Sequence, residues 1–450
     1  MIKRHLHEFL NEWKASPGRR PLILRGARQV GKSTLIREFG KGYDYYLEFN
    51  LEKKADRTLF DNLDDLSKTI QLLYLTRGIR PDEDKSHLIF LDEVQEKPAL
   101  LESLRYFYED HPHLHVIATG SLLEFSLNKV MRTPVGRVSY ADLHPLNFEE
   151  YLGALGHQVG LDAYGQLPFP DHLTGPLFDL FHEYVMIGGM PAMVSAYLTA
   201  DKDLAKVSPL YADLIHAYRE DVEKYALTHN HRQAIRHLMD VAPHHMDNRI
   251  NLSKLGGNAY RSREMRAAFT ALEKARLLEL VHPTTQTHLP ITPALRKRPR
   301  LHFLDVGLIN HQLGLHAELL SLDDLHAASK GKLVQQVVSQ ELRSLQQGPG
   351  ERMAFWVREE GTTSSEVDLV YPYHDLLLPV EIKSGAKGRL RSLHEYMDRC
   401  PHGFAVRFYK GPVRMEDMKT RKGKAYKLMS LPYFLAGKLR SYVKWRVGDE

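Results

Sequence analysis

The stretch GARQVGKST, residues 26–34, constrains the fold of this chain more than any other segment. It follows an apolar run at residues 21–24 that is typical of a short buried strand, and it precedes residues 35–39, which favour a helix. A G-x-x-x-x-G-K-[ST] loop between a strand and a helix directs successive backbone N–H groups into one cavity, at the positive end of the helix dipole. We therefore predict a polyphosphate site. A turn that matches the pattern by chance is the alternative, which the flanking strand and helix disfavour.

The residues of this loop have separate expected roles. Lys32 is expected to reach the β- and γ-phosphates, and Ser33 is expected to ligate Mg²⁺. Gly26 and Gly31 permit backbone angles and a close approach that a Cβ atom would obstruct. The predicted cofactors are therefore ATP and Mg²⁺, held by the continuous loop Gly26, Ala27, Arg28, Gln29, Val30, Gly31, Lys32, Ser33 and Thr34.

Two adjacent carboxylates, Asp92 and Glu93, end a later apolar run that begins at residue 87. In P-loop enzymes an acidic residue at such a strand end holds the Mg²⁺ shell, and a following Glu polarises the attacking water. We assign Asp92 to the metal and Glu93 to the water. A strand that merely ends in a solvated acidic turn is the alternative.

A further predicted strand, residues 115–119, should end beside the strand that carries Asp92. Thr119 and Ser121 are therefore candidates to sense the γ-phosphate or to orient the water. Hydroxyl groups are common at strand ends, so a purely structural role stays open for both residues.

The order of these segments predicts the fold class. Strands alternate with helices, including a second strand at residues 45–50 and a helical stretch at residues 59–70, and the functional residues lie where strands end. This pattern is typical of a parallel three-layer α/β module. A length of 450 residues predicts two to four domains.

Composition excludes several other classes of protein. Hydrophobic residues make up 43% and charged residues 26%, which is ordinary for a soluble globular protein. The single cysteine, Cys400, excludes an internal disulfide and a Cys-based zinc cage, and the histidine clusters lack partners at ligand spacing. The first residues, MIKRHLHEFLNEWK, lack the apolar segment of a secretory signal, and no run is long enough to span a bilayer. We expect a cytoplasmic protein with no membrane partner.

Four segments together resemble the prokaryotic AAA-type ATPases that carry a C-terminal domain of unknown function. They are residues 26–33 (GARQVGKS), 88–93 (LIFLDE), 117–121 (IATGS) and 136–151 (GRVSYADLHPLNFEEY). The resemblance implies that Arg137 contacts phosphate, either within its own chain or in a neighbouring copy; a structural salt bridge is the alternative. It also implies a winged helix in the middle of the chain and a nuclease-like fold at the end.

The predicted organisation has four parts. They are a P-loop AAA-type ATPase domain (1–156), a helical lid (170–230), a winged helix-turn-helix (231–305) and a PD-(D/E)XK nuclease-like domain (325–450). Residues 157–175, with scattered Gly and Pro, are predicted to form a linker or a loop. Helical spacing over 176–198 is broken by Gly188, Gly189 and Pro191, and residues 210–227 continue as an amphipathic helix.

Residues 251–282 predict a winged helix. A short helix and a Gly-Gly turn lead to Ser262 as N-cap, followed by a helix with core spacing and a strand at residues 277–281. DNA is the predicted partner, with Arg263 and Arg266 at the start of the recognition helix. A winged helix used only for packing is the alternative. A basic cluster nearby in sequence consists of Arg296, Lys297, Arg298 and Arg300.

The last third of the chain carries a second candidate site. After a helix at 334–345 and a strand at 354–357, an acidic residue in one strand (366–370) is followed by E-x-K in the next (378–383), which is the PD-(D/E)XK nuclease signature. Asp368 and Glu381 are expected to share a second Mg²⁺ or a Mn²⁺ ion, and Lys383 to stabilise charge or orient the attacking water.

One departure weakens this nuclease assignment. The related proteins often have Glu where this chain has Gln335, and Glu341 is the candidate substitute for that third acidic ligand. A helix at residues 387–391 would add positive charge for a phosphate backbone. A nuclease fold that has lost its chemistry is the alternative.

Three functions remain in competition. The leading one is Mg²⁺-dependent ATP binding and hydrolysis that drives or gates a C-terminal nuclease-like, DNA-binding module. The others are a metal-dependent nuclease switched by ATP, and an ATP-bound DNA-binding regulator with little turnover. The adjacent Asp92 and Glu93 favour turnover. The pattern leaves the oligomeric state and the source of any arginine finger open.

Overall fold

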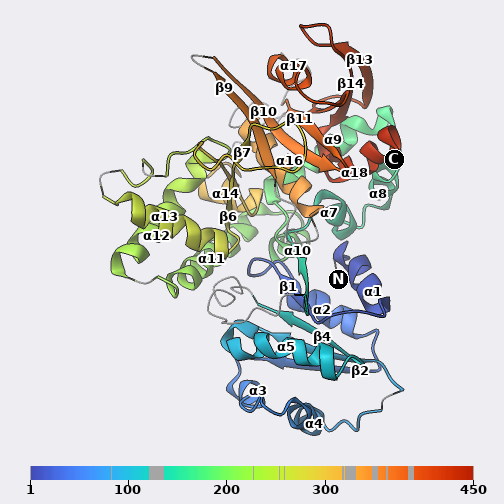
Figure 1. Ribbon diagram of the computed structural model, residues 1–450, viewed down its shortest axis with the longest axis vertical. Helices are drawn as coiled ribbons and strands as arrows, with labels where there is room; N and C mark the ends of the chain where they lie inside the picture. Colours follow the sequence, from blue (N-terminus) through green and yellow to red (C-terminus); the bar gives the residue numbers. More distant parts are fainter. Residues whose placement is uncertain are drawn as a thin grey trace.

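The computed structural model describes residues 2–82, 84–120, 136–226, 228–252, 254–257, 259–316, 319, 331–346, 353–360, 363–383 and 390–448. Figure 1 shows an α/β unit from the N-terminal part of the chain at one end and a large mixed sheet from the C-terminal part at the other. Helices from the middle of the chain lie between and beside them. One continuous apolar core joins these parts, from Ile36 through Phe148 and Tyr184 to Val338 and Phe434.

The N-terminal sheet is parallel, with the strand order β2-β3-β4-β1-β5. Its strands are β1 (Leu22–Arg25), β2 (Tyr45–Asn50), β3 (His87–Asp92), β4 (Leu114–Thr119) and β5 (Ser139–Asp142). β3 and β4 are buried along their whole length, as expected for parallel strands that are covered on both faces. The predicted strands are confirmed, and β5 is an additional edge strand that the hydrophobic pattern did not indicate.

Helices cover both faces of this sheet. Alternate residues of β1 enter different cores: Leu22 and Leu24 pack with α2, whereas Ile23 packs with α4 and α5. The predicted three-layer α/β module is therefore confirmed. Of the predicted helical stretch at residues 59–70, only residues 66–70 are helical, at the start of α4, and residues 59–65 form turns and irregular backbone. The helices are α1 (Leu6–Ala15), α2 (Lys32–Gly40), α3 (Lys54–Thr58), α4 (Leu66–Thr76), η1 (Val94–Glu96) and α5 (Pro98–Asp110).

A helical segment follows the sheet. It consists of α7 (Phe148–Ala154), α8 (Gln158–Tyr164), η2 (Asp171–Leu173), α9 (Thr174–Ile187), α10 (Pro191–Thr199) and α11 (Leu204–Glu223). The prediction of a linker at 157–175 was wrong, because the His157 side chain caps α8 by accepting a bond from Gly160 N (2.9 Å) and Tyr164 is buried. The predicted break between α9 and α10 is confirmed: Gly188 has φ 74°, and a Cβ on Gly189 would lie 2.1 Å from Leu146 O.

The middle module runs from α12 to α14. Its elements are α12 (His229–Val241), η3 (Ala242–His245), α13 (Ser262–Lys274), β6 (Leu278–Val281), β7 (Pro283–Thr284), β8 (Arg300–Phe303) and α14 (Val306–Gln312). β6 and β8 form an antiparallel pair in which Val281 faces Arg300. The short helix predicted after residue 251 is absent from the described residues there, which form turns, and Ser262 is the first helical residue rather than the N-cap.

The C-terminal sheet is mixed, with the order β13-β14-β12-β11-β10-β9-β7. β9, β10 and β11 form an antiparallel meander, and β12 runs parallel to β11. The middle module supplies β7 as the edge strand beside β9, so the two parts share one sheet. The remaining elements are α16 (Lys332–Ser344), β9 (Ala354–Glu360), β10 (Thr363–Tyr373), β11 (Leu376–Ile382), α17 (Arg391–Met397), β12 (Phe404–Tyr409), β13 (Arg414–Lys419), β14 (Ala425–Pro432), η5 (Tyr433–Lys438) and α18 (Leu439–Val447).

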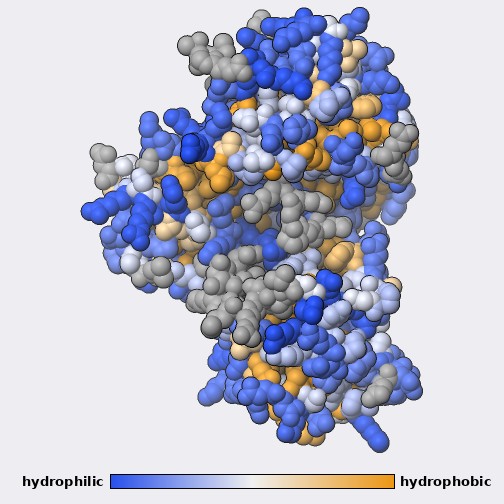
Figure 2. Space-filling model, viewed as in Figure 1, coloured by the Kyte–Doolittle hydropathy of each residue, from blue (hydrophilic) through white to orange (hydrophobic). Residues whose placement is uncertain are grey.

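Hydrophilic residues cover most of the described surface on the face that Figure 2 shows. Within the described ranges, no helix combines the length and the apolar character that crossing a bilayer requires.

Candidate nucleotide site and C-terminal acidic pocket

The loop between β1 and α2 has the backbone shape that its glycines predict. Gly26 has φ 154°, and a Cβ at this position would lie 2.4 Å from Leu143 O. Gly31 has φ 96° and is the N-cap of α2. Both glycines are therefore required by the path of the chain, because an L-residue with a side chain is strained at such angles.

Lys32 is folded back onto this loop. Its Nζ donates to the carbonyl oxygens of Gly26 (2.9 Å) and Ala27 (2.8 Å). Burial lowers the pKa of Lys32 to about 8, because the charged ammonium loses water. A phosphate anion would supply the counter-charge that this buried ammonium lacks, so the residue fits a polyphosphate ligand.

An open cavity of about 1100 Å³ lies in front of the loop, which is ample for a nucleotide. Its walls come from three places in the sequence: the N-terminal residues, the loop with Glu93, and the start of α10. The lining includes Lys3, Arg4, His7, Arg28, Gln29, Gly31, Lys32, Ser33, Thr34, Glu93, Pro191 and Ser195.

Three oxygen-bearing side chains meet at the edge of the sheet beside α2. Ser33 Oγ donates to Asp92 Oδ2 (2.7 Å), and Thr119 Oγ1 donates to Asp92 Oδ1. The predicted placement of Thr119 beside Asp92 is thus confirmed by the pairing of β3 and β4. A hydroxyl and a carboxylate are ligands that Mg²⁺ prefers, so this set fits the predicted ion. Ser121 lies outside the described residues.

Glu93 takes a left-handed conformation, with φ 54°. Its backbone N–H donates to Asp92 Oδ1 (3.1 Å), and Gln95 Nε2 donates to its Oε2 (2.6 Å). The turn directs Glu93 to the cavity that also contains Lys32. A carboxylate held in this way at the cavity wall can orient a water toward a bound phosphate.

Residues far away in sequence hold the loop, and sequence reasoning did not indicate them. Arg4 NH1 donates to Val30 O (2.8 Å), and its Nε pairs with Glu150 (3.1 Å). From α11, Tyr218 OH donates to Arg28 O (2.8 Å), and Asp221 forms an ion pair with the Arg28 guanidinium. No local pattern marks contacts that span 190 residues, so only the fold identifies them.

Arg137 does not lie at the phosphate edge. β5 runs parallel to β1, and Ser139 faces Leu22 at the start of that strand, so Arg137 precedes β5 at the opposite edge from Gly26. Its Nε donates to Glu109 (2.6 Å). The expectation that Arg137 contacts phosphate within its own chain was therefore wrong, because residues 136–137 lead into a strand rather than out of one. A contact in a neighbouring copy stays a prediction.

A different arginine stands near the loop. Arg276 follows α13 with φ 61°, and its NH2 pairs with Asp142 Oδ1 (2.9 Å) at the end of β5. Arg25 donates to the same carboxylate through Nε (3.1 Å) and NH2 (2.9 Å). The positive charge of Arg276 also contributes to the lowered pKa of Lys32, after burial. The middle module thus brings a cation to the nucleotide edge of the sheet.

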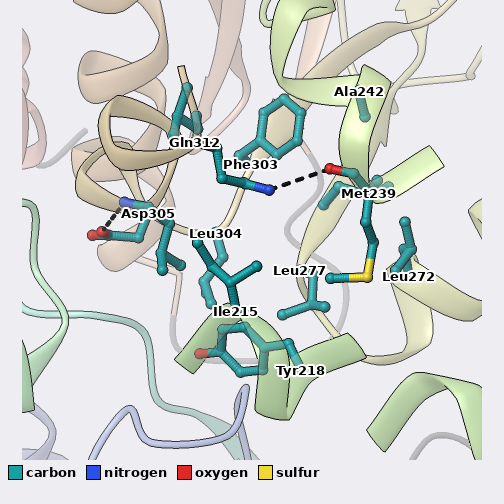
Figure 3. Close-up of a pocket in the computed structure, with 13 residues that line it drawn as sticks. Ile215, Tyr218, Met239, Ala242, Leu272, Leu277, Phe303, Leu304, Asp305 and Gln312 are labelled. Carbon is teal, nitrogen blue, oxygen red and sulfur yellow. Dashed lines mark hydrogen bonds between the residues drawn. The ribbon is translucent and has the colours of Figure 1, made fainter. Parts of the chain in front are cut away.

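A small apolar cavity of about 50 Å³ lies behind α11 (Figure 3). Ile215 and Tyr218 of α11 line one side of it, and Met239 and Leu272 of the middle module line another. Gln312 Nε2 donates to Met239 O (3.2 Å) at its rim. α11 therefore lies between the P-loop and the middle module and contacts both.

In the C-terminal sheet, Asp368 of β10 and Glu381 of β11 lie on neighbouring strands. Leu369 pairs with Val380, which places Asp368 opposite Glu381, and Ile382 N donates to Asp368 Oδ2 (2.8 Å). Burial, followed by the charge of Asp368, raises the pKa of Glu381 to about 8. The predicted juxtaposition of the two carboxylates is confirmed.

The surroundings of these carboxylates suit a cation. Lys383 Nζ pairs with Glu381 Oε1, whereas Glu381 Oε2 is buried and has no hydrogen-bond partner among the described residues. Gln335 Nε2 donates to Asp368 Oδ1 (2.9 Å), so the amide stands where an acidic ligand was expected. An orphaned carboxylate oxygen beside a second carboxylate fits a divalent ion.

Glu341 does not substitute for that ligand. Six residues after Gln335 on α16, it is turned roughly 240° around the helix. Its Oε1 accepts bonds from Phe148 N (3.0 Å) and Tyr184 OH (2.8 Å). Among the described residues, no three His, Cys, Asp or Glu side chains lie close enough to hold a metal together. The assignment of Glu341 as a metal ligand was wrong, because the helix period directs it to α7 and α9.

The basic cluster is also divided by the fold. Arg300 is buried and contacts Glu366, Asp368 and Asp247, so it cannot face a phosphate backbone. Lys297 pairs with Glu359 (2.6 Å). The remaining predicted arginines are exposed on the surface, and they are Arg263, Arg266, Arg296 and Arg298. Residues 387–389 of the predicted basic helix lie outside the described residues.

Three family models match the chain. Residues 18–152 match an AAA domain, residues 178–319 a domain of unknown function (DUF8612), and residues 330–433 another domain of unknown function (DUF4143). A search of curated proteins returned no match.

Two solved structures are distantly similar. The Walker-type ATPase of Pyrococcus abyssi is 16% identical over 70% of this chain and 96% of that chain, with a TM-score of 0.45. A Signal Transduction ATPase with Numerous Domains (STAND) protein with a tetratricopeptide repeat sensor, from Pyrococcus horikoshii, is 14% identical over 77% of this chain and 46% of that chain, with a TM-score of 0.28. These likenesses are too distant to support an argument.

The parallel sheet, the loop at Lys32 and the Ser33–Asp92 pair define a P-loop nucleotide-binding domain. The match of residues 18–152 to an AAA domain identifies it further as an AAA-type ATPase domain.

Proposed function

We propose that this protein binds and hydrolyses ATP with Mg²⁺, and that the nucleotide cycle gates its C-terminal module. One observation carries the proposal: Ser33 and Thr119 both donate to Asp92, beside the cavity that Lys32 and Glu93 line together. Binding, metal ligation and water activation each have a residue of the required type there.

The roles divide as follows. When bound, Mg²⁺ would neutralise charge on the phosphates and orient them. Ser33 and Asp92 would hold the ion, and Lys32 would exchange its two carbonyl partners for phosphate oxygens. Glu93, fixed by Gln95, would orient the water and accept its proton.

Two contacts are suited to transmit the state of the loop. Arg28, in the loop itself, is held by Asp221 and Tyr218 of α11, and α11 packs against the middle module. Arg276 of the middle module is bonded to Asp142 at the edge of the same site. A loop that rearranges around phosphates would alter either contact and so shift the middle module.

The C-terminal module is proposed to be nuclease-like. A helix (α16), a three-stranded meander, a second helix (α17) and a strand parallel to the last meander strand give the order of a PD-(D/E)XK core. The pairing of Asp368 opposite Glu381, with Lys383 bonded to Glu381, supports this proposal. The helices and two-stranded sheet of the middle module support a winged helix that binds DNA, with Arg263 and Arg266 exposed on α13.

The test is the rate of phosphate release from Mg·ATP. We expect turnover by the wild type, none by Lys32→Ala, and ATP binding without turnover by Glu93→Gln, because only water activation is lost. Single- and double-stranded DNA are added in parallel. Faster phosphate release with DNA would show that the nucleotide site and the proposed DNA-binding part of the chain are coupled. Equal rates in wild type and Glu93→Gln would refute the assignment of Glu93.

DNA binding has its own test, the dependence of affinity on salt. Arg263→Ala should lower the salt slope by about one, whereas Arg440→Ala on the exposed face of α18 should leave it unchanged. An affinity that does not vary with salt would exclude this mode of binding.

A further inference from the structure

A buried arginine from the middle module occupies the C-terminal acidic pocket. Arg300, on β8, is 7% exposed, and its guanidinium contacts three carboxylates, two on β10 (Glu366 and Asp368) and one, Asp247, in the segment between η3 and α13. NH2 contacts Glu366 and Asp368 Oδ1 (3.4 Å), and NH1 contacts Asp247 Oδ1 (3.5 Å) and the carbonyl of Asp368 (3.3 Å). The pocket is therefore shared between two parts of the chain.

Arg300 contacts the carboxylate oxygen of Asp368 that a metal ion would need. Asp368 Oδ2 is taken by Ile382 N (2.8 Å), so Oδ1 is the oxygen that remains to meet a further ligand. That atom receives Gln335 and, at the longer distance of 3.4 Å, Arg300. Glu381 is 4% exposed, and its Oε2 has no partner in the described part of the chain. A cation that bridges Glu381 Oε2 and Asp368 Oδ1 would compete with Arg300 and Gln335 for Asp368 Oδ1, and Arg300 is the competitor that carries a positive charge.

The charges give the same result. Four carboxylates meet here, namely Asp247, Glu366, Asp368 and Glu381. They face Arg300 and Lys383, together with Arg249, which contacts Glu366 (3.5 Å) at the rim. Arg300 is the buried cation that offsets Asp368, so its withdrawal leaves an uncompensated negative charge at the oxygen that a metal ion would use.

We propose that Arg300 and a divalent cation are alternative occupants of the pocket formed by Asp368 and Glu381. The inference rests on the proposed role of these two carboxylates as cation ligands. The arginine keeps the pocket closed to metal, and withdrawal of β8 opens it. The C-terminal site thus carries an intramolecular latch that belongs to another module.

The latch is mechanically connected to the nucleotide site. β8 pairs with β6, and Val281 faces Arg300 at one end of this pair. Arg276 immediately precedes the other end and is bonded to Asp142 beside the P-loop. Of the six residues from Arg276 to Val281, the last four form β6 and span roughly 10 Å of extended chain. A movement of Asp142 would therefore be transmitted through Arg276 and the paired strands β6 and β8 to Arg300.

The experiment is a titration of Mn²⁺ into the full-length Lys32→Ala protein without nucleotide, followed by calorimetry and by the shift in melting temperature. Lys32→Ala is the common background, which limits binding at the P-loop. Arg300→Gln should tighten the Mn²⁺ Kd by about tenfold or more, because a fixed positive charge is removed from the ion's position. Arg249→Gln is the matched control, since it removes a guanidinium from the rim without opening Asp368, and should change the Kd by about twofold at most.

Two further variants keep the result decisive. Asp368→Asn added to Arg300→Gln should abolish the gain in Mn²⁺ affinity that Arg300→Gln produces. If Arg300→Gln does not fold, Arg300→Lys retains a positive charge, and its single ammonium cannot reach Glu366 and Asp368 together, so the Kd should be tighter than with arginine.

Two results would overturn the latch and leave the metal site in place. The first is an equal Mn²⁺ affinity with and without Arg300, while Asp368→Asn still abolishes binding. The metal site would then exist, but Arg300 would not control it. The other is the same gain from Arg249→Gln. Absence of Mn²⁺ binding in every variant would refute both the proposed metal site and the latch. The proposed ATPase activity is tested separately, by phosphate release from the protein with Lys32 intact.

Discussion

Glu341 should make the stability of the folded chain depend on pH, and Glu341→Gln should remove this dependence. The carboxyl group is fully buried, its Oε1 accepts two hydrogen bonds, and its Oε2 has no partner among the described residues. Burial raises its pKa from 4.5 to about 8, since the ionised form loses its water. The folded state therefore binds the proton more tightly than the unfolded state.

The sign and size follow by linkage. Below about pH 4.5 the group is protonated in both states and costs nothing; as pH rises from there to about 8, only the unfolded state ionises, and the free energy of unfolding falls. At about 1.4 kcal/mol per pH unit, the full loss above pH 8 is at most about 5 kcal/mol. The amide that Glu341→Gln introduces stays neutral in both states, and its oxygen can accept the same two bonds.

The assay is the melting temperature between pH 5 and pH 9. Glu341→Gln should match the wild type near pH 5 and melt at a higher temperature above pH 8, so that the two curves diverge as pH rises. Glu12→Gln, the same change at an exposed position of α1, should run parallel to the wild type. Parallel curves for Glu341→Gln as well would refute the reasoning.

Two other substitutions test contacts that hold the modules together. Gly189→Ala would place a Cβ 2.1 Å from the backbone oxygen of Leu146 and should destabilise the protein by about 2–4 kcal/mol, measured by denaturant unfolding. Gly175→Ala is its control: a Cβ there meets no atom within 4 Å, and a loss of stability as large as that of Gly189→Ala would contradict the argument. Asp221→Asn removes the charge that holds Arg28 and should speed hydrogen exchange in the last turns of α11 by about threefold to tenfold; unchanged exchange would show that the pair does not anchor the helix.

The nucleotide site could be predicted from the sequence because its residues are local. One loop supplies Gly26, Gly31, Lys32 and Ser33, and the end of one strand supplies Asp92 and Glu93. Buried parallel strands leave continuous apolar runs, and their shared direction brings their ends to one edge. Asp368 and Glu381 could be predicted to converge because they lie on consecutive strands, which pair as neighbours in the sheet.

The wrong predictions have two causes. Some residues have partners that lie far away in the sequence, and for others the sequence pattern does not show to which side of its element the side chain points. Arg137 was placed at the wrong edge because the short strand β5 carries only four residues and no strong apolar run. Glu341 was predicted to be a metal ligand because it is a carboxylate, without regard to the side of α16 on which it lies. Arg300 looks like part of a basic surface run, and only the fold reveals the acidic pocket that buries it. Ion pairs between modules leave no local signal.

Equilibrium binding of ATP tests the central claim most directly. ATP is titrated into the wild type, Glu93→Gln and Lys32→Ala, with and without Mg²⁺. We expect saturable binding by the wild type and Glu93→Gln that is strengthened by Mg²⁺, and strongly weakened binding by Lys32→Ala, because the buried ammonium is the counter-charge for the phosphates. A wild-type protein that binds no ATP, or a Lys32→Ala variant that binds it as tightly as the wild type, would contradict the account.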